Sequence, residues 1–174
     1  MHRGQSAREV RRQKRPVYSV LTNCTYDGMC YNAAEVETRL AKSVDRVHFD
    51  EAWYGYARFN PMYRDRYAMR GDPATHPKDG PTVFATHSTH KLLAALSRTS
   101  YIHIRDGRSA IDHGRFNEAY CSQASTSPLY ALVASNDVAA AMMDGPGWQD
   151  THAGNHRRSG CVPARASHVH ARNF

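Results

Sequence analysis

Apolar and polar positions in the middle of the chain follow two periods, one typical of strands and one typical of helices. Short runs rich in apolar and β-branched residues predict four strands, at 16–22, 46–50, 82–86 and 99–104. Helical spacing predicts three helices, at about 32–43, at about 115–124 and from Ser127 to about Asp144. The order of these elements predicts an α/β fold with a mainly parallel sheet and flanking helices.

The ends of the predicted helices add detail to this pattern. Asn32 can cap the first helix. Its apolar side chains share one face: Val36, Leu40 and Val44. Ser127 can cap the last helix, because Pro128 suits a first helical position. The connection over roughly 60–80 is long for a simple crossover, and such length is more typical of a functional loop than of a structural one.

Two segments at the ends of the chain lack this periodicity. Residues 1–15 are polar and rich in arginine, and residues 148–174 are dense in His, Arg, Ala and Gly. We therefore expect a disordered basic head at 1–15, one patterned domain at 16–147, and a tail at 148–174 that is disordered or foreign to the domain.

The distribution of charge argues against a nucleic-acid partner. The net charge is +7, but residues 16–147 hold 13 basic and 14 acidic residues, so the patterned domain is close to neutral. A folded phosphate-binding face would require the reverse distribution. No stretch of the sequence approaches the roughly 18 apolar residues of a membrane helix. The spacing of the four cysteines favours reduced thiols in a cytoplasmic protein.

Asp50 and Lys91 are the candidate chemical groups. Asp50 ends the predicted strand 46–50, and Lys91 follows the predicted strand 82–86. Ligands bind at the carboxyl ends of the strands in such sheets, so both groups are expected at the same edge. A pyridoxal phosphate site requires an amine that can form a Schiff base and a carboxylate that can keep a pyridine nitrogen protonated.

Each of these residues alone allows a plainer interpretation. A lysine after a strand is usually solvated, and an aspartate at a strand end usually caps a loop. His48, His87 and His90 could suggest a metal ion. No cysteine or carboxylate partner stands at a zinc-like spacing in the sequence, so we expect no metal and a structural polar role for these histidines.

The sequence around Lys91 resembles the cofactor-attachment site of the bacterial Orn/Lys/Arg decarboxylases, which share the aspartate aminotransferase fold. The resemblance begins with the run Ser-Thr-His-Lys-Leu-Leu-Ala-Ala-Leu-Ser at 88–97. Further blocks look like the family in family order, at 22–28, 48–61, 116–120 and 126–130. Within the family, Phe-Asp-Glu-Ala-Trp-Tyr-Gly-Tyr at 49–56 and Ala-Thr-His-Ser-Thr-His at 85–90 look most like the biodegradative arginine decarboxylases.

The resemblance implies roles for the two candidate groups. Lys91 would be the Schiff-base lysine, and Asp50 would pair with the pyridine nitrogen of pyridoxal 5'-phosphate. Ala52 would pack near the ring of the cofactor. These three residues would form the part of the site that holds the ring.

The resemblance also implies contacts to the cofactor phosphate. Ser88 and His90 would contact this phosphate or line the substrate side of the site. Ser125 and Thr126, at the start of the last predicted helix, would suit a phosphate oxygen. In this family that contact can reach the cofactor of the neighbouring subunit.

The resemblance runs from about Pro16 to Gly145 and covers the later part of the family's cofactor domain, so it implies a partial major domain. The implied function is that of a fragment of a cytoplasmic decarboxylase that converts arginine to agmatine and carbon dioxide. The full-length family is expected to form homodimers or higher oligomers. Residues 1–15 do not resemble the phosphate loop expected there. The alternative is a catalytically inactive remnant that acts at most as a subunit-interaction module.

Overall fold

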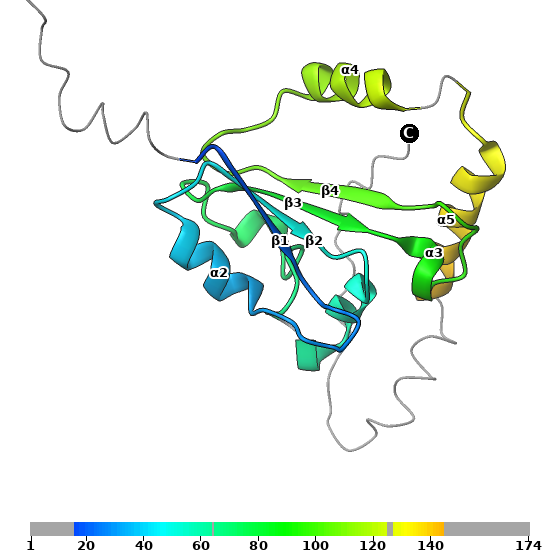
Figure 1. Ribbon diagram of the computed structural model, residues 1–174, viewed down its shortest axis with the longest axis horizontal. Helices are drawn as coiled ribbons and strands as arrows, with labels where there is room; N and C mark the ends of the chain where they lie inside the picture. The colour runs from blue at the N-terminus through cyan, green and yellow to red at the C-terminus, as the bar shows by residue number, and fades with distance from the viewer. Residues whose placement is uncertain (1–15, 64, 125–126, 145–174) are drawn as a thin grey trace, which may run out of the picture.

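A four-stranded sheet organises the part of the chain that the structure describes (Figure 1). The structure is a computed structural model, and it describes residues 16–63, 65–124 and 127–144. The strands lie in chain order across the sheet: β1 (Tyr18–Thr22), β2 (Arg46–Asp50), β3 (Thr82–His87) and β4 (Tyr101–Arg105). The helices are α2 (Ala33–Leu40), α3 (Thr89–Leu92), α4 (His113–Gln123) and α5 (Tyr130–Asp144). Between β2 and β3 lie three short 3-10 helices: η1 (Gly55–Phe59), η2 (Pro61–Tyr63) and η3 (Pro73–Thr75).

The sheet is mainly parallel, as predicted. β1, β2 and β3 are parallel, and β4 runs antiparallel to β3. The register places Thr22, Asp50 and Thr86 side by side at the carboxyl ends of the parallel strands. β4 begins at Tyr101 rather than at residue 99, because Thr99 closes a turn in which its amide donates to the Leu96 carbonyl at 3.2 Å.

One face of the sheet carries the hydrophobic core. Four residues that alternate along the two central strands have no exposed surface: Val47, Phe49, Val83 and Ala85. α2 covers this face together with part of the connection after β2, and Val36 and Leu40 of α2 pack against the cluster. Side chains of a strand point alternately to the two faces of the sheet, so buried and half-buried residues alternate along β2.

Two of the predicted helix starts are close to those observed. Oδ1 of Asn32 accepts a hydrogen bond from the Glu35 amide at 3.1 Å, which confirms the predicted cap of α2. α4 begins at His113, slightly before the predicted residue 115. The reason is a second cap, since Oδ1 of Asp112 accepts from the Arg115 amide at 2.8 Å.

α2 ends earlier than predicted. The helix stops at Leu40 rather than at residue 43, and Val44 enters the core beyond its end. The guanidinium of Arg108 donates to the carbonyl oxygens of Ala41 and Val44. The bond to Ala41 satisfies a carbonyl group at the helix cap that has no partner within the helix, and the bond to Val44 satisfies one in the segment just after it.

The predicted start of the last helix was wrong. α5 begins at Tyr130, and Ser127 and Pro128 precede it as non-helical residues. The carbonyl oxygen of Leu129 accepts from the Val133 amide at 3.3 Å, so Leu129 is the residue from which the helix starts. Pro128 therefore lies before the first helical turn rather than inside it.

The connection between β2 and β3 contributes to the core, which its length alone did not indicate. Tyr67 and Ala68 have no exposed surface, and Met69 is buried as well. Ala68 and Met69 join the cluster under the central strands, and Tyr67 forms a second cluster with Cys24 and Ala57. The middle of this connection therefore has a structural role.

α4 and α5 pack less closely than α2. Among the side chains that the structure describes, α4 buries none and α5 buries that of Ala139. Figure 1 shows α2 and α4 on opposite sides of the sheet. None of the helices in the described part of the chain is long and apolar enough to cross a membrane.

A buried ion cluster joins α2 to β4. Oε1 of Glu37 accepts from Arg70 at 2.6 Å and from Arg105 at 2.7 Å. The three side chains are between 10% and 12% exposed, so they are largely removed from water. A charge in this position is stable only while it is paired, and Glu37 therefore holds α2, the connection and β4 together.

Replacing Glu37 by Ala is expected to lower the free energy of unfolding by about 3–5 kcal/mol, because two buried guanidinium groups then lose the carboxylate that balances their charge. The matched control is Glu35→Ala on the same helix. Its carboxylate pairs with Arg39 at 2.6 Å but is 57% exposed. This exposed pair contributes at most about 0.5 kcal/mol. Urea denaturation followed by circular dichroism measures the free energy of unfolding of both variants. Equal losses of this free energy would contradict the role of Glu37 as a buried link between α2, the connection and β4.

Candidate active site

The candidate site lies at the carboxyl ends of β2 and β3. Asp50 is the last residue of β2, and its register partner on β3 is Thr86. Lys91 lies in α3, which follows β3 after the single residue Ser88. The parallel pairing brings both groups to one edge of the sheet, where ligands bind in folds of this type. No hydrogen bond or ion pair joins the two side chains within the described residues.

Asp50 is half-buried and keeps one carboxylate oxygen available. Its Oδ1 accepts from the Ala52 amide at 3.2 Å, and within the described ranges Oδ2 has no hydrogen-bond partner. His48, on the same face of β2, lies 3.2 Å from Thr86 through Nε2 and 2.5 Å from the Tyr18 hydroxyl through Nδ1. Burial lowers the pKa of His48, so its ring is neutral near pH 7. Asp50 can therefore accept a hydrogen bond from a ligand.

The ammonium group of Lys91 lies over an aromatic ring. Its Nζ is 5.7 Å from the centroid of the Tyr26 ring, and Tyr26 packs against Trp53 at 4.8 Å between ring centroids. Such a cation–π contact contributes about 0.5–1 kcal/mol at an exposed site. No carboxylate in the described part of the chain pairs with Lys91. The amine is thus weakly held, and Tyr26 is a neighbour that the sequence did not indicate.

Ser88 and His90 lie at the start of α3. Nδ1 of His90 is 2.7 Å from the Thr99 carbonyl oxygen. Because a carbonyl oxygen only accepts, Nδ1 carries a proton, and Nε2 is the ring nitrogen left to face a ligand. The two predicted positions of His90, at the phosphate or on the substrate side, therefore stay predictions. Ser88 caps α3 without a side-chain capping bond, so its hydroxyl can donate to a phosphate.

The other predicted cofactor contacts are placed less directly. Ala52 is half-buried next to Asp50 and donates its amide to that carboxylate, which leaves its methyl group free to pack against a ligand. Ser125 and Thr126 lie outside the described residues. Their predicted contact with a phosphate oxygen therefore stays a prediction.

α3 is anchored to α5 through buried hydroxyl groups. Thr89 is buried, and its Oγ1 lies 2.9 Å from Oγ1 of Thr99 and 2.6 Å from Oδ1 of Asn136. The Leu96 amide donates to Oγ of Ser135 at 3.2 Å. These contacts fix the short helix that carries Lys91 against a longer one.

Glu51 forms a buried polar network that the sequence did not predict. Its side chain has no exposed surface, and its carboxylate accepts from three donors. These donors are Nδ2 of Asn23 at 2.9 Å, the Ala68 amide at 2.7 Å and Nε2 of His87 at 2.9 Å. A carboxylate directly after a strand is usually solvated, so the one available signal was its place next to Asp50.

The ring of His87 packs against that of His103, with 4.6 Å between the ring centroids. Burial, with His87 and Arg58 nearby, lowers the pKa of His103 to about 3. Nδ1 of His103 is buried without a hydrogen-bond partner among the described residues. His103 is therefore neutral at physiological pH and adds no charge beside His87.

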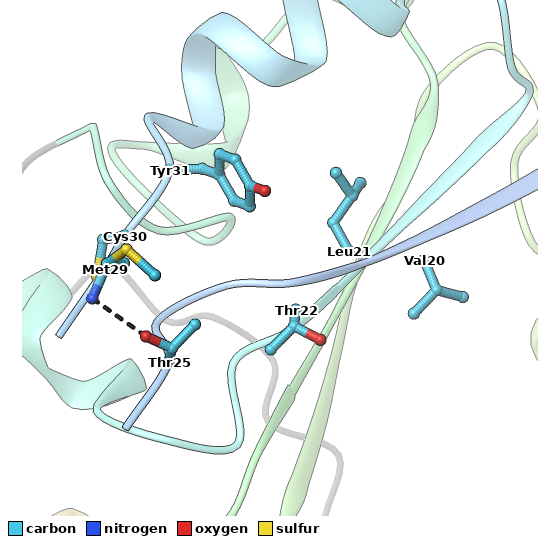
Figure 2. Close-up of a pocket in the computed structure, with 7 residues that line it drawn as sticks. All are labelled: Val20, Leu21, Thr22, Thr25, Met29, Cys30 and Tyr31. Carbon is cyan, nitrogen blue, oxygen red and sulfur yellow. Dashed lines mark hydrogen bonds between the residues drawn. The ribbon is translucent and has the colours of Figure 1, made fainter. Parts of the chain in front are cut away.

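A hollow of about 490 Å³ lies beside this edge, against β1 (Figure 2). Its lining comes from β1 and the segment that follows: Val20, Leu21, Thr22, Thr25, Met29, Cys30 and Tyr31. Figure 2 shows the ring of Tyr31 pointing toward Leu21, and the Met29 amide donating to Oγ1 of Thr25 at 3.3 Å. None of the predicted site residues within the described ranges lines this hollow, so it is not the candidate site.

The chain matches a known protein family over most of its length. The family described as Orn/Lys/Arg decarboxylase, major domain, matches residues 4–158. The chain therefore belongs to the Orn/Lys/Arg decarboxylase family, and the resemblance drawn from its sequence is confirmed.

Two curated relatives illustrate the similarity. The chain is 68% identical over 132 residues to the biodegradative arginine decarboxylase of Escherichia coli (strain K12), a match that covers 76% of this chain and 17% of the relative. It is 52% identical over 136 residues to the lysine decarboxylase LdcA of Pseudomonas aeruginosa, covering 78% of this chain and 18% of the relative. The chain thus spans less than a fifth of the length of these relatives.

Solved structures agree with the fold assignment. Lysine decarboxylase A from Pseudomonas aeruginosa matches with a TM-score of 0.71 and 49% identity, covering 79% of this chain and 18% of that one. The constitutive lysine decarboxylase of E. coli matches with a TM-score of 0.68 and 42% identity, covering 82% and 19%. The predicted partial major domain of this fold group is therefore confirmed.

Acidification is expected to destabilise the protein through His103. Below pH 6.5 the unfolded chain binds a proton at this residue, whereas the folded protein does so only near pH 3, so stability is lost as the pH falls through this window. The cost is about 1.4 kcal/mol per pH unit, or about 2 kcal/mol between pH 6.5 and pH 5. Urea denaturation at pH 6.5 and pH 5 should show a smaller loss of unfolding free energy for His103→Gln than for the wild-type protein. Equal losses in the variant and the wild-type protein would show that His103 is not the cause.

Proposed function

We propose that this chain carries the Schiff-base lysine and the ring-binding carboxylate of a pyridoxal phosphate-dependent arginine decarboxylase. The observation that carries the proposal is the placement of Asp50 and of the Lys91-bearing helix α3 at the ends of two adjacent parallel strands. Membership of the Orn/Lys/Arg decarboxylase family supports it.

The residues at this edge fit pyridoxal 5'-phosphate. Oδ2 of Asp50, available within the described part of the chain, can accept the N–H of a protonated pyridine ring. His48 beside it is uncharged and leaves the negative charge of Asp50 to the ligand. Lys91, held by the Tyr26 ring, supplies an amine for the aldehyde of the cofactor. When bound, the cofactor would take up the electrons left as the substrate loses its carboxylate.

The residues of α3 would complete the proposed site. The hydroxyl of Ser88 would donate to the cofactor phosphate. The ring of His90, fixed by the Thr99 carbonyl, would use Nε2 to hold a proton on the substrate side. Ser125 and Thr126 would add a phosphate contact, which in an oligomer can belong to the neighbouring subunit.

Arginine is the proposed substrate, with agmatine and carbon dioxide as products. The support is the difference in identity, 68% to a biodegradative arginine decarboxylase against 52% to a lysine decarboxylase. A cytoplasmic homodimer or higher oligomer is the proposed setting of this activity.

A second candidate function is an interaction module without catalysis. α4 buries none of its described side chains, and α5 leaves Leu129 before it and Met142 within it more than half exposed. Helices of this kind can pack against another subunit. Native mass spectrometry of the purified chain tests this candidate, since a stable complex without cofactor binding would favour it.

Incubation with pyridoxal phosphate followed by borohydride reduction is expected to label Lys91. The chain has four lysines, Lys14, Lys42, Lys78 and Lys91, so peptide mapping by mass spectrometry identifies the labelled residue directly. Exposed Lys42 serves as the internal reference. Label on Lys42 and Lys78 equal to that on Lys91 would contradict the proposal.

Asp50→Ala is expected to reduce the label on Lys91, because the pyridine ring of the cofactor then lacks the carboxylate that binds its nitrogen. The matched control is Asp45→Ala, which removes a carboxylate next to the opposite end of the same strand, where it pairs with Arg108 at 3.4 Å. The labelled fraction is compared at equal amounts of folded protein. If both variants lose label equally, Asp50 has no special role.

Carbon dioxide release separates the proposed substrates. The purified chain with pyridoxal phosphate is incubated with carboxyl-labelled arginine, lysine or ornithine, and Lys91→Ala serves as the blank. Release from arginine that exceeds release from the other two supports the proposal. Preference for lysine or ornithine would contradict the substrate, and no release from any of them would favour the module without catalysis.

A further inference from the structure

We propose that Glu51 is a positioning residue that fixes Asp50 and Lys91 relative to each other from beneath the site. This inference rests on the proposed function of those two groups and adds a residue to it. Glu51 would act through Asn23, Ala68 and His87, and would itself touch neither cofactor nor substrate.

The side chains of Asp50 and Glu51 point in different directions. Asp50 and Glu51 are neighbours, and side chains alternate between the two faces at a strand end. Asp50 stays half-buried on the face that carries His48, whereas Glu51 turns inward and has no exposed surface. One residue of the pair is placed to meet a ligand and the other to meet the protein.

Glu51 joins the ends of all three parallel strands. Its amide donates to the Thr86 carbonyl at 3.0 Å, which extends the β2–β3 pairing beyond Asp50. The backbone amide of Asn23 donates to the Asp50 carbonyl at 2.8 Å, which extends the β1–β2 pairing in the same way. The Glu51 carboxylate then accepts from the side chains of both Asn23 and His87. The strand ends are therefore joined by backbone and side-chain bonds together.

The bond between Glu51 and His87 connects Glu51 to the helix that carries Lys91. His87 is the last residue of β3, Ser88 caps α3, and Lys91 lies in its first turn, where its amide donates to the Ser88 carbonyl at 3.3 Å. A bond that fixes the His87 ring thus fixes the residue from which α3 starts. A carboxylate only accepts, so Nε2 of His87 carries the shared proton.

The His87 ring is confined by the groups packed around it. A Cβ atom at Gly55 would lie 2.7 Å from Cδ2 of this ring, so the ring packs directly on the glycine backbone. On the other side it meets His103 at 4.6 Å between centroids. With Glu51 on its Nε2, the ring is confined by three contacts, and this confinement preorganises the start of α3.

A purely structural role for Glu51 predicts a different outcome from a positioning role. Glu37 is the matched comparison, because it is also a buried carboxylate with several donors but lies on α2, away from the strand ends. Removal of either carboxylate leaves buried donors without a partner and lowers stability. Only the removal of Glu51 should change the groups around Asp50 and Lys91.

The test compares Glu51→Ala, Glu51→Gln and Glu37→Ala in the full chain, under conditions where circular dichroism shows all of them folded. The borohydride label on Lys91 per folded molecule should fall at least about tenfold in Glu51→Ala and stay near the wild-type level in Glu37→Ala. Glu51→Gln keeps an acceptor oxygen for Asn23 and Ala68. Its label on Lys91 should therefore lie between those of Glu51→Ala and Glu37→Ala. Equal labelling in the two alanine variants would overturn the inference.

Amide hydrogen exchange, measured without cofactor, provides the second readout. Glu51→Ala should speed exchange at Asp50–Ala52 and at Ser88–Leu92 by at least about tenfold, whereas Glu37→Ala should speed exchange in α2. Unchanged exchange at both site segments would overturn the inference. An unlabelled Lys91 in the wild-type protein would instead sink the proposed function, and the exchange pattern would still decide the role of Glu51.

His87→Gln provides the rescue. A glutamine amide can donate to Glu51 from a similar position, so its exchange at Ser88–Leu92 should stay close to the wild-type rate. His87→Ala lacks this donor and should resemble Glu51→Ala. If His87→Gln and His87→Ala behave alike, the Glu51–His87 bond does not position α3.

Discussion

Parallel pairing between β2 and β3 is the interaction on which the rest of the structure depends. It aligns Asp50 with Thr86 and so brings two carboxyl ends to one edge of the sheet. The pairing is stable because Val47, Phe49, Val83 and Ala85 bury the same face of both strands under α2 and the connection. A shift of one residue would turn these side chains to the wrong face, so the core also fixes the register of the site.

The polar interior of the protein is divided between two carboxylates. Glu37 pairs with two guanidinium groups and joins α2 to β4, while Glu51 accepts from the Asn23 side chain, the Ala68 amide and the His87 ring at the strand ends. Buried carboxylates are costly unless all of their partners are present, which is why each of them joins several segments. Asp50 differs from both, because it is half-buried and retains an oxygen for a ligand.

Local pattern predicted the elements better than it predicted their ends and their contacts. The strands, the cap at Asn32 and the mainly parallel sheet follow from periodicity and capping chemistry. The buried connection did not, because the burial of Tyr67 depends on residues far away in the sequence. Asp50 and Lys91 were identifiable through a recognisable motif. The role of Glu51 depends on three donors from different segments, and no pattern along the chain indicates them.

The central claim is that Asp50 holds the pyridine nitrogen of a cofactor attached to Lys91. The most direct measurement is the nuclear magnetic resonance shift of pyridoxal phosphate that is isotope-labelled at its ring nitrogen and bound to the full chain. The account predicts the shift of a protonated ring in the wild-type protein and in Asp45→Ala, and the shift of an unprotonated ring in Asp50→Ala. An identical shift in the wild-type protein and in Asp50→Ala would contradict it.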